Sequence, residues 1–428
     1  MKAAPIPLFL GAVLATLIFP GSPGGSIGTA RAQDIATART APLETPGTHS
    51  VPSDHPQPDS RARRAAVALR LYRQLARGSG NVFVSPYSLE MALAMAQAGA
   101  HGSTARAFAQ VLGSDPAGSP AQPGGNGLSF TVANALWPQR RFPLRPGYVA
   151  EIQTKFAGQV QPLDFSGAPQ ASARIINHWV SAKTHGRIDS LVSASEIDRQ
   201  TSLLLTDAVY FKGAWVKPFE PGDTYRQNFH LSGGRRVRTG MMHNTAHFDF
   251  YRGKTFKMLV LPFRGGHDAV AILVLLPDHI SQLGSLERQL KASTLDDWVG
   301  HAQRALVEVT LPKFRDTDLL NLTAAAKALG IAIAFSKHRA DFSGIASLVT
   351  RRLYISDVLQ KTYVDLDEKG TEASAATAVM MEATATAVYE APTEQPIVFD
   401  ANHRFVYLIR DETTGDILFI GRMADPQG

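Results

Sequence analysis

The sequence predicts an α+β protein, because its helical and strand-like segments are not strictly alternating along the chain. Segments with the composition or periodicity of helices lie at 61–77, 87–100, 104–112, 171–188 and 319–329. Strand-like segments, most of them apolar, lie at 81–86, 128–137, 203–211, 257–262, 269–276, 305–311, 353–359, 405–410 and 416–422. The strands come from distant parts of the chain, so several of them are expected to share sheets.

The N-terminus has the pattern of an export signal. Lys2 supplies a positive charge, Ile6 to Phe19 is an apolar run, and Ala30-Arg31-Ala32 is a small-x-small cleavage site. We expect cleavage after Ala32, which makes 1–32 a signal peptide, rather than retention as an anchor. No later stretch reaches the roughly 18 apolar residues that span a bilayer. The mature protein is therefore expected to be secreted or periplasmic.

The segment 33–60 is polar and rich in proline. Its prolines are Pro42, Pro46, Pro52, Pro56 and Pro58. This composition favours a disordered tether over a packed structure. No second shift of this kind occurs later, so 61–428 is predicted to form one domain.

The composition excludes several classes of protein. There is no cysteine, so neither disulfides nor a thiol nucleophile are possible, and the formal charge of +6 is too mild to indicate nucleic-acid binding. His243 and His247 have the spacing of metal ligands but no convincing helix to bring them onto one face. No catalytic set assembles, so we expect no enzyme activity, no cofactor and no metal, and a binding protein is favoured.

The first strong structural signal is a buried helix. Residues 81–86 read as a short strand ended by Pro86, and 87–100 is apolar on all sides, which is typical of a helix inside a core. Ser85 and Ser88 lie at the start of this helix, where hydroxyl groups cap exposed backbone amides.

The stretch 367–389 is unusual in composition. After Asp367, Glu368 and Gly370, its residues are almost all small or β-branched, and Glu382 is the one charge from Ala373 to Tyr389. Propensity alone would allow a helix, but a surface helix needs a polar face that this segment lacks. A strand in need of a partner is the other interpretation.

Seven blocks together identify the chain as similar to the serpin family over essentially all of 61–428. They are Asn81-Val82-Phe83-Val84-Ser85-Pro86-Tyr87-Ser88, Ile176-Asn177-His178-Trp179-Val180, Ala208-Val209-Tyr210-Phe211-Lys212-Gly213-Ala214-Trp215, Leu311-Pro312-Lys313-Phe314, Asp341-Phe342-Ser343-Gly344-Ile345, Glu368-Lys369-Gly370-Thr371-Glu372-Ala373 and Phe419-Ile420-Gly421-Arg422. Each block is weak alone, but their order and separation are specific.

The resemblance implies a serpin fold, with three β-sheets surrounded by about eight helices and an exposed reactive-centre loop near the C-terminus, and it implies a monomer. The stretch 367–389 falls on that loop. In the mechanism that the resemblance implies, a serine protease attacks the loop and forms an acyl-enzyme. The loop then inserts into the main sheet and traps the protease.

The residues of the predicted hinge suit insertion, because alternate side chains of a strand face one side. Counting from Thr371, the inward set is small and uncharged: Thr371, Ala373, Ala375, Thr377 and Val379. The outward set carries the one charge, Glu372. With Glu368 and Gly370 before it, this hinge is intact, which favours an inhibitor.

The position of the reactive bond is less well defined. The family's usual count from Glu368 lands on Thr384–Ala385, but the loop is longer than in antithrombin-like members. Val388–Tyr389 and Tyr389–Glu390 are therefore rivals. Small residues suit an elastase- or subtilisin-like protease, whereas Tyr389 suits a chymotrypsin-like one. No Arg or Lys lies between Glu372 and Glu394, which makes trypsin-like targets improbable.

The resemblance also points to polar residues beneath the opening sheet, in the family's shutter and breach regions. Ser85, Ser88, Asp207 and Gln360 are expected to form a buried hydrogen-bonded cluster, and Trp215 lies at the breach. Asp207 and Gln360 stand where the family usually has Asn and His. A buried Asp must be neutral or well paired, so we expect pH dependence through Asp207.

Between Leu112 and Leu128, where family members fit a helix that heparin can use, the sequence is rich in Gly and Pro. We expect this helix to be absent or vestigial, and heparin-type activation to be absent with it. The basic cluster Arg235, Arg236 and Arg238 reads as a solvated turn. Two alternatives remain beside serine protease inhibition: a non-inhibitory serpin-fold binding or chaperone-like protein, and an inhibitor of cysteine proteases.

Overall fold

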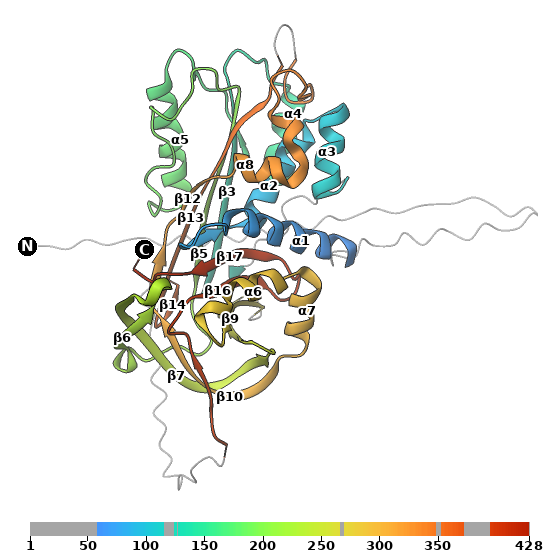
Figure 1. Cartoon of the computed structure of the whole chain (residues 1–428). Coiled ribbons are helices and arrows are strands. Elements are labelled where there is room, and N and C mark those ends of the chain that lie inside the picture. Colours follow the sequence, from blue (N-terminus) through green and yellow to red (C-terminus); the bar gives the residue numbers. More distant parts are fainter. Residues whose placement is uncertain are drawn as a thin grey trace, which may run out of the picture. The chain divides into compact units, whose positions relative to one another are not determined.

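The computed structural model describes residues 58–114, 124–125, 127–265, 269–347, 352–371 and 394–427. Its helices, in chain order, are α1 (Pro58–Leu75), α2 (Pro86–Ala98), α3 (Gly102–Leu112), α4 (Pro146–Phe156), α5 (Pro169–Lys183), α6 (Leu283–Gln289), α7 (Ala292–Gly300) and α8 (Thr323–Ala326). Most of these helices gather around one half of the molecule in Figure 1, while α6 and α7 cover the other half.

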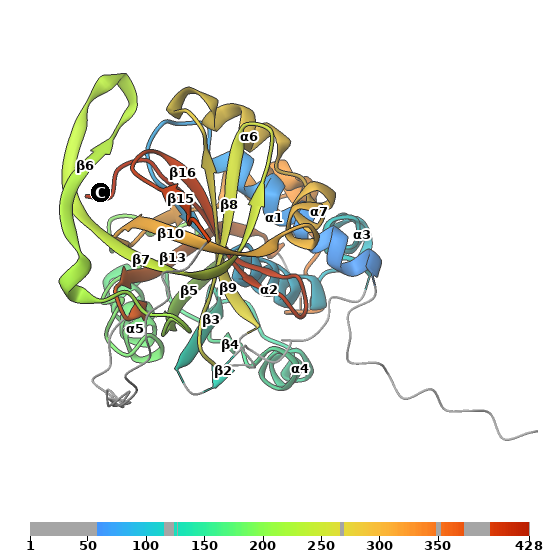
Figure 2. The ribbon, with the colours of Figure 1, turned by 90° about the horizontal axis from the view of Figure 1, so that it is seen from below.

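One half of the molecule is a nine-stranded sheet with the order β1-β17-β16-β9-β8-β7-β10-β15 and with β6 paired to β7. Its strands are β1 (Val82–Val84), β6 (Tyr225–His230), β7 (Arg236–Arg252), β8 (Phe256–Pro262), β9 (Val270–Pro277), β10 (Gln303–Pro312), β15 (Ile397–Asp400), β16 (Phe405–Asp411) and β17 (Ile417–Met423). The long β7 pairs with β6 at its start and with β8 at its end, which joins two of the three expected sheets. Figure 2 shows the β6–β7 hairpin at the edge of this sheet.

The other sheet has the order β11-β13-β5-β3-β2, with β12, β14 and β4 on its margins. Its strands are β2 (Gly124–Gly125), β3 (Leu128–Pro138), β4 (Gln159–Val160), β5 (Leu203–Gly213), β11 (Phe314–Asp316), β12 (Leu319–Asn321), β13 (Ile355–Asp367) and β14 (Gly370–Thr371). In Figure 1, β3, β5 and β13 run lengthwise from the upper helices to the lower half.

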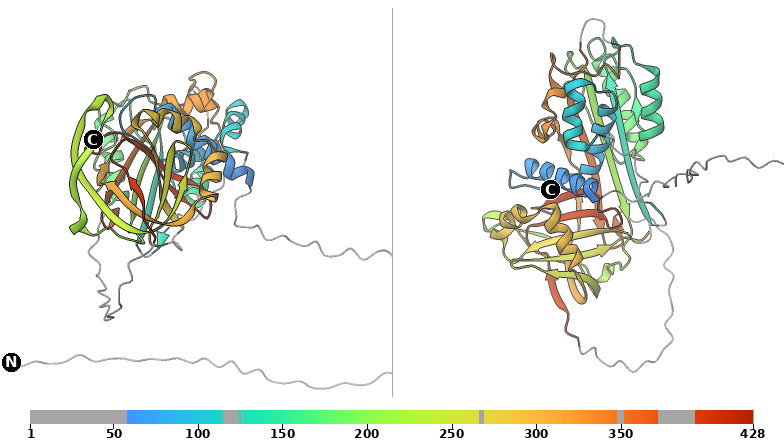
Figure 3. Two further views of the ribbon diagram at one scale, coloured as in Figure 1. Left: turned by 60° about the horizontal axis from the view of Figure 1, so that its bottom comes forward. Right: turned by 90° about the vertical axis from the view of Figure 1, so that its right-hand side faces the viewer.

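The two faces of β5 pack on different cores. Leu204, Ala208 and Tyr210 belong to a cluster with Ile176 and Val180 of α5. The alternate residues of the strand belong to the main core, which also holds the apolar side chains of α2. The right view of Figure 3 shows α5 on one side of these strands. The near-continuous apolar sequence of β5 therefore reflects burial on both faces, as its composition predicted.

β5 and β13 are direct parallel neighbours. Their register runs from Leu203↔Ile355 to Tyr210↔Tyr363, with one irregularity near Ile355. Parallel neighbours must be joined by a crossover, and here more than a hundred residues of chain intervene between the two strands. The seam between β5 and β13 is the part of the molecule on which the candidate site is built.

Several sequence-based expectations were wrong in detail. Residues 319–329 were expected to be one helix, but Leu319–Asn321 is strand β12 against β13, and the helical turns begin at Thr323. β13 is much longer than the predicted 353–359, because its polar second half pairs on both sides. The first helix begins at Pro58 rather than Arg61.

Other elements were not predicted at all. They include α4 and the long strand β7, whose sequence mixes polar and apolar residues without a clear period. The helix expected to be missing between Leu112 and Leu128 falls mostly on 115–123, outside the described residues. Within the described part, α3 ends at Leu112 and Gly124–Gly125 pairs with the start of β3.

Candidate functional site

The candidate site begins where the β5–β13 pairing ends. Beyond Tyr210↔Tyr363, β13 turns at Glu368 and Lys369 and returns as β14, which pairs antiparallel with it (Leu366↔Thr371 and Asp367↔Gly370). Gly370 also forms an antiparallel bridge with Ala214, just after β5. Because β11 holds the other edge of β13, β14 lies between β13 and β5.

This position of β14 requires a glycine. Gly370 has φ +129°, a conformation that residues with a side chain rarely adopt. A Cβ atom there would lie 2.0 Å from the carbonyl oxygen of Gly213 and 2.7 Å from Cα of Ala214. The turn can therefore approach β5 this closely only because position 370 has no side chain.

A second set of contacts fixes the turn before Gly370, and we call it the hinge cluster: Trp215, Thr224, Lys313 and Glu368. Glu368 accepts hydrogen bonds from Lys313 (2.9 Å) and from Thr224 Oγ1 (2.8 Å). Trp215 donates its indole N–H to the carbonyl of Asp367 (2.9 Å). Burial acts to raise the pKa of Glu368, but the bonds from Lys313 and Thr224 outweigh it and leave this pKa lowered.

Removing the cation of the hinge cluster is expected to cost little stability. Lys313→Met should lower the free energy of unfolding by about 1 kcal/mol or less, because the Lys313 side chain is 40% exposed and Glu368 keeps the hydroxyl of Thr224. Thermal unfolding at low and high salt measures this loss, which should shrink as salt rises. Lys254→Met, at an exposed position, is the control. A loss of several kcal/mol that is independent of salt would contradict this.

A fully buried polar group lies midway along the seam, and we call it the central cluster: Ser85, Ser88, Asp207 and Gln360. Gln360 Oε1 accepts from the backbone N–H of Ser85 (2.8 Å), and Gln360 Nε2 donates to the carbonyl of Ser85 (2.9 Å) and to Asp207 Oδ2 (2.5 Å). Ser88 Oγ donates to Asp207 Oδ1. The cluster thus connects β5, β13 and the start of α2.

Asp207 and Gln360 are register partners across the seam, so their hydrogen bond closes the sheet directly. Burial raises the pKa of Asp207 to about 7, although the hydrogen bonds from Ser88 and Gln360 act to lower it. Because no cation lies among the hydrogen-bond partners of this carboxylate, its charged form is poorly compensated.

The structure adds residues that sequence reasoning missed. Asn134 on β3 donates to the carbonyl of Ser88 (3.2 Å), which extends the central cluster across a third strand. Thr224 reaches Glu368 from a segment 144 residues away. Neither carries a local signal, since the contacts exist only after the strands assemble. Lys313 lies in one of the seven blocks that carry the family resemblance, but nothing in that block indicates that Glu368 is its partner.

Several predicted site residues lie outside the described residues: Ala373, Ala375, Thr377, Thr384, Ala385, Val388, Tyr389 and Glu390. Of Thr371, only the backbone is described. The predicted hinge is therefore visible up to β14, and the reactive bond stays a prediction.

The histidines of β7 have ordinary hydrogen-bond partners. His243 lies between Gln227 (2.8 Å) and Thr310 (3.0 Å), and His247 lies 3.5 Å from Glu394. No helix in the described part of the chain is both long and apolar enough to cross a membrane.

Comparison with known proteins gives the class to which this fold and hinge belong. The family model for "Serpin (serine protease inhibitor)" matches residues 62–426. The chain is 36% identical over 371 residues to an uncharacterized serpin-like protein of Thermococcus kodakarensis, covering 83% of each. It is 32% identical over 379 residues to leukocyte elastase inhibitor A of Mus musculus, covering 84% of this chain and 97% of that one. The chain therefore belongs to the serpin family.

The solved structures agree with this assignment. The thyroxine-binding globulin complex with thyroxine matches with a TM-score of 0.74 and 25% identity, covering 86% of this chain and 99% of the globulin. The arrangement of helices and sheets is thus the serpin fold. Many serpins inhibit serine proteases, and some members do not.

Proposed function

We propose that this serpin is a suicide-substrate inhibitor of serine proteases that traps the acyl-enzyme by inserting its loop into the main sheet. The observation that carries the proposal is the position of β14. The strand runs antiparallel to β13, bridges Ala214 beside β5, and so already forms the first step of a strand between them. Further insertion requires the chain after Thr371 to continue in the same direction.

The register of β14 identifies where each later residue would arrive. If the pairs Leu366↔Thr371 and Ala214↔Gly370 continued in register along the strands, Ala373 would arrive between Phe211 and Val364, and Thr377 between Asp207 and Gln360. These four neighbours are buried, and they lie on the α2 side of the sheet. The small, uncharged set from Thr371 to Val379 is therefore the set that would face the main core.

Insertion exchanges one set of strand pairs for two. The parallel β5–β13 ladder would open, and each strand would gain an antiparallel neighbour, which is the slightly more stable pairing. The cost falls on the central cluster, because the Asp207–Gln360 hydrogen bond cannot survive a strand between its partners. The hydroxyl of Thr377 would arrive between the two groups and can hydrogen-bond to both.

The chemistry of the trap follows from competition between two rates. The protease serine attacks a loop carbonyl, the amine half of the loop leaves, and an ester joins the two proteins. Water would hydrolyse this ester in an ordinary substrate. Insertion faster than hydrolysis carries the bound protease away with its catalytic geometry disturbed. The small residues around Thr384 support elastase- or subtilisin-like targets, and the signal peptide predicted from the sequence supports action outside the cytoplasm.

The test is complex formation with pancreatic elastase and subtilisin. The wild-type chain should give an SDS-stable complex, and mass spectrometry of the released C-terminal fragment locates the cleaved bond. Ala373→Arg should abolish the complex while cleavage continues, since the new charge would face Phe211 and Val364 in the core. Glu372→Arg is the matched control, because its register neighbours Lys212 and Asp365 are half-exposed.

A wild-type chain that is only cleaved would remove the inhibitor proposal in favour of a binding protein. That second candidate is supported by the similarity to thyroxine-binding globulin, whose solved complex contains thyroxine. A trapped complex with a papain-like protease, and none with a serine protease, would instead assign the chain to cysteine proteases.

A further inference from the structure

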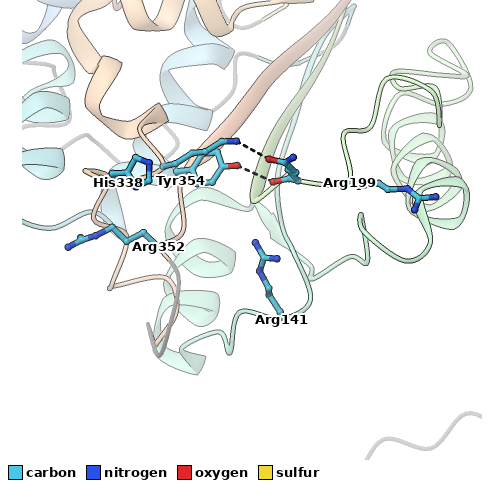
Figure 4. A pocket seen from close by; sticks show the side chains of 7 residues that line it. Arg141, Arg199, His338, Arg352 and Tyr354 are labelled. Carbon is cyan, nitrogen blue, oxygen red and sulfur yellow. Dashed lines mark hydrogen bonds between the residues drawn. The ribbon is translucent and has the colours of Figure 1, made fainter.

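A basic depression lies at the end of the β5–β13 seam that is remote from the hinge. It has a volume of about 480 Å³. Its lining residues are Arg141, Arg199, Gln200, Lys337, His338, Arg352 and Tyr354, and we call it the basic pocket. Figure 4 shows the Arg141 guanidinium pointing into the open space below Tyr354, whereas the guanidinium groups of Arg199 and Arg352 point outward on either side.

The residues of the basic pocket come from both sides of the seam. Arg141 follows β3, and Arg199 and Gln200 precede β5. Lys337, Arg352 and Tyr354 belong to the chain that leads into β13. The first register pair of the seam, Leu203↔Ile355, lies only a few residues beyond the pocket.

Two hydrogen bonds already cross the seam inside the pocket. Lys337 Nζ donates to Gln200 Oε1 (3.0 Å), and the hydroxyl of Tyr354 donates to the carbonyl of Gln200 (3.0 Å). Both dashed contacts are drawn in Figure 4. The pocket therefore joins the two segments that enter β5 and β13.

The positive charge of the pocket is only partly balanced by acidic side chains. Within the described part of the chain, no ion pair to a carboxylate is formed by Arg141, Arg199, Lys337 or Arg352. Arg352 donates to the carbonyl of Ala340 (3.4 Å), and the Arg141 guanidinium lies over the ring of Phe142.

Two acids lie nearby. Asp198 accepts from the backbone N–H of Gln200, and Asp341 accepts from Ser343, and neither carboxylate lines the pocket. Burial acts to raise the pKa of Asp341, but its hydrogen bonds with Ser343 and the charge of Arg352 help to lower this pKa, so this acid balances part of the charge of Arg352. The lining therefore carries three arginines, a lysine and a histidine and no acidic side chain, and the Arg141 guanidinium points into the space.

We propose that the basic pocket binds a polyvalent phosphate anion and, by holding both sides of the seam, slows the separation of β5 and β13. Guanidinium groups bind phosphate oxygens through paired, charge-assisted hydrogen bonds, which favours phosphate over a monovalent anion. The exposed side chain of Arg352 would have to turn from the carbonyl of Ala340 toward the space. A ligand that then contacts Arg141 on one side and Arg352 on the other stabilises the closed sheet more than the opened one. The proposed binding of phosphate does not depend on the proposed inhibitory function, whereas its effect on protease trapping does.

The same phosphate chemistry has two sources, a free polyphosphate chain and a phosphate monoester on a lipid surface. Calorimetric titration with sodium tripolyphosphate tests the first, and co-sedimentation with phosphatidylcholine vesicles that contain phosphatidic acid tests the second. The double variant Arg141→Ala/Arg352→Ala should weaken binding by at least about tenfold. The control Arg235→Ala/Arg236→Ala removes equal charge from the exposed start of β7 and the residue before it, and should change binding less than about twofold.

The outcomes separate clearly. If the wild-type chain binds tripolyphosphate or the vesicles and the Arg141→Ala/Arg352→Ala variant loses that binding, the result supports the site and identifies the source of the phosphate. Absence of both, or an equal loss in the two double variants, overturns it. In the second stage, bound tripolyphosphate should raise the midpoint of thermal unfolding and lower the fraction of elastase trapped rather than released. Binding without either change would overturn the clamp, while a chain that traps no protease even without ligand would overturn the inhibitory function instead.

Discussion

The variant Asp207→Asn is expected to be more stable than the wild type at about pH 8, by up to about 4 kcal/mol, and close to it at about pH 4. The reason is that Asp207 is fully buried and its carboxylate has no cation among its hydrogen-bond partners. An amide keeps an oxygen to accept from Gln360 and supplies a nitrogen that can donate to Ser88 Oγ. It therefore preserves the geometry of the central cluster and removes the charge.

The direction of the pH dependence follows from proton uptake. Burial raises the pKa of Asp207 from 3.8 to about 7, so between these values the folded state holds a proton that the unfolded state has released. Unfolding then releases a proton, and rising pH favours it. The contribution of Asp207 to the free energy of unfolding is thus fully present below about pH 4. It falls as the pH rises from about 4 to about 7, and it is lost above about pH 7.

The difference between variant and wild type is the quantity to measure, because other buried acids act in the same direction. Burial raises the pKa of Glu90 to about 8 and that of Asp316 to about 7, so both proteins should lose stability as pH rises. Urea unfolding from about pH 4 to 8 gives the two curves. Asp189→Asn, at an exposed position, should follow the wild type. Parallel curves for Asp207→Asn and wild type would show that Asp207 is not a source of the dependence.

The candidate site could be predicted in part, from one local sequence pattern and from the family resemblance. The alternation of small residues from Thr371 is visible in the sequence, since a strand that must enter a packed sheet constrains every second residue. The central cluster came from the resemblance, which placed Asp207 and Gln360 together. The partners Asn134 and Thr224 carry no such pattern, because a single hydrogen bond to a distant strand demands only one polar residue.

The fold was predicted best where burial is uniform. The sequences of β5 and α2 are mostly apolar, and both elements lie close to their expected bounds. β7 was missed because one strand serves three neighbours in turn, so that its pattern of exposure changes along its length. The basic pocket could not be predicted from the sequence for another reason. Its arginines come from separate segments, and only the meeting of β3, β5 and β13 brings them together.

Gly370→Ala is expected to impair trapping far more than stability. The added Cβ would lie 2.0 Å from the carbonyl oxygen of Gly213, so the turn must move away from β5. The φ of +129° adds strain of about 1–3 kcal/mol for a residue with a side chain. Because β14 is only two residues long, displacement of β14 can relieve most of this strain. The free energy of unfolding should therefore fall by about 1–3 kcal/mol, with the fold retained.

The consequence for trapping is larger because β14 is the start of the proposed inserted strand. Once the turn leaves the space between β13 and β5, insertion must begin from an unpaired chain. Insertion is then slower, so a larger fraction of the acyl-enzyme is hydrolysed before it is trapped. Each 1.36 kcal/mol added to the insertion barrier slows it tenfold, so strain of this size shifts the outcome from mostly trapped to mostly cleaved. The ratio of SDS-stable complex to cleaved chain measures this shift. Gly147→Ala, where an added Cβ meets open space, should leave the ratio unchanged. A Gly370→Ala variant that traps elastase as well as wild type would mean that insertion does not start from β14.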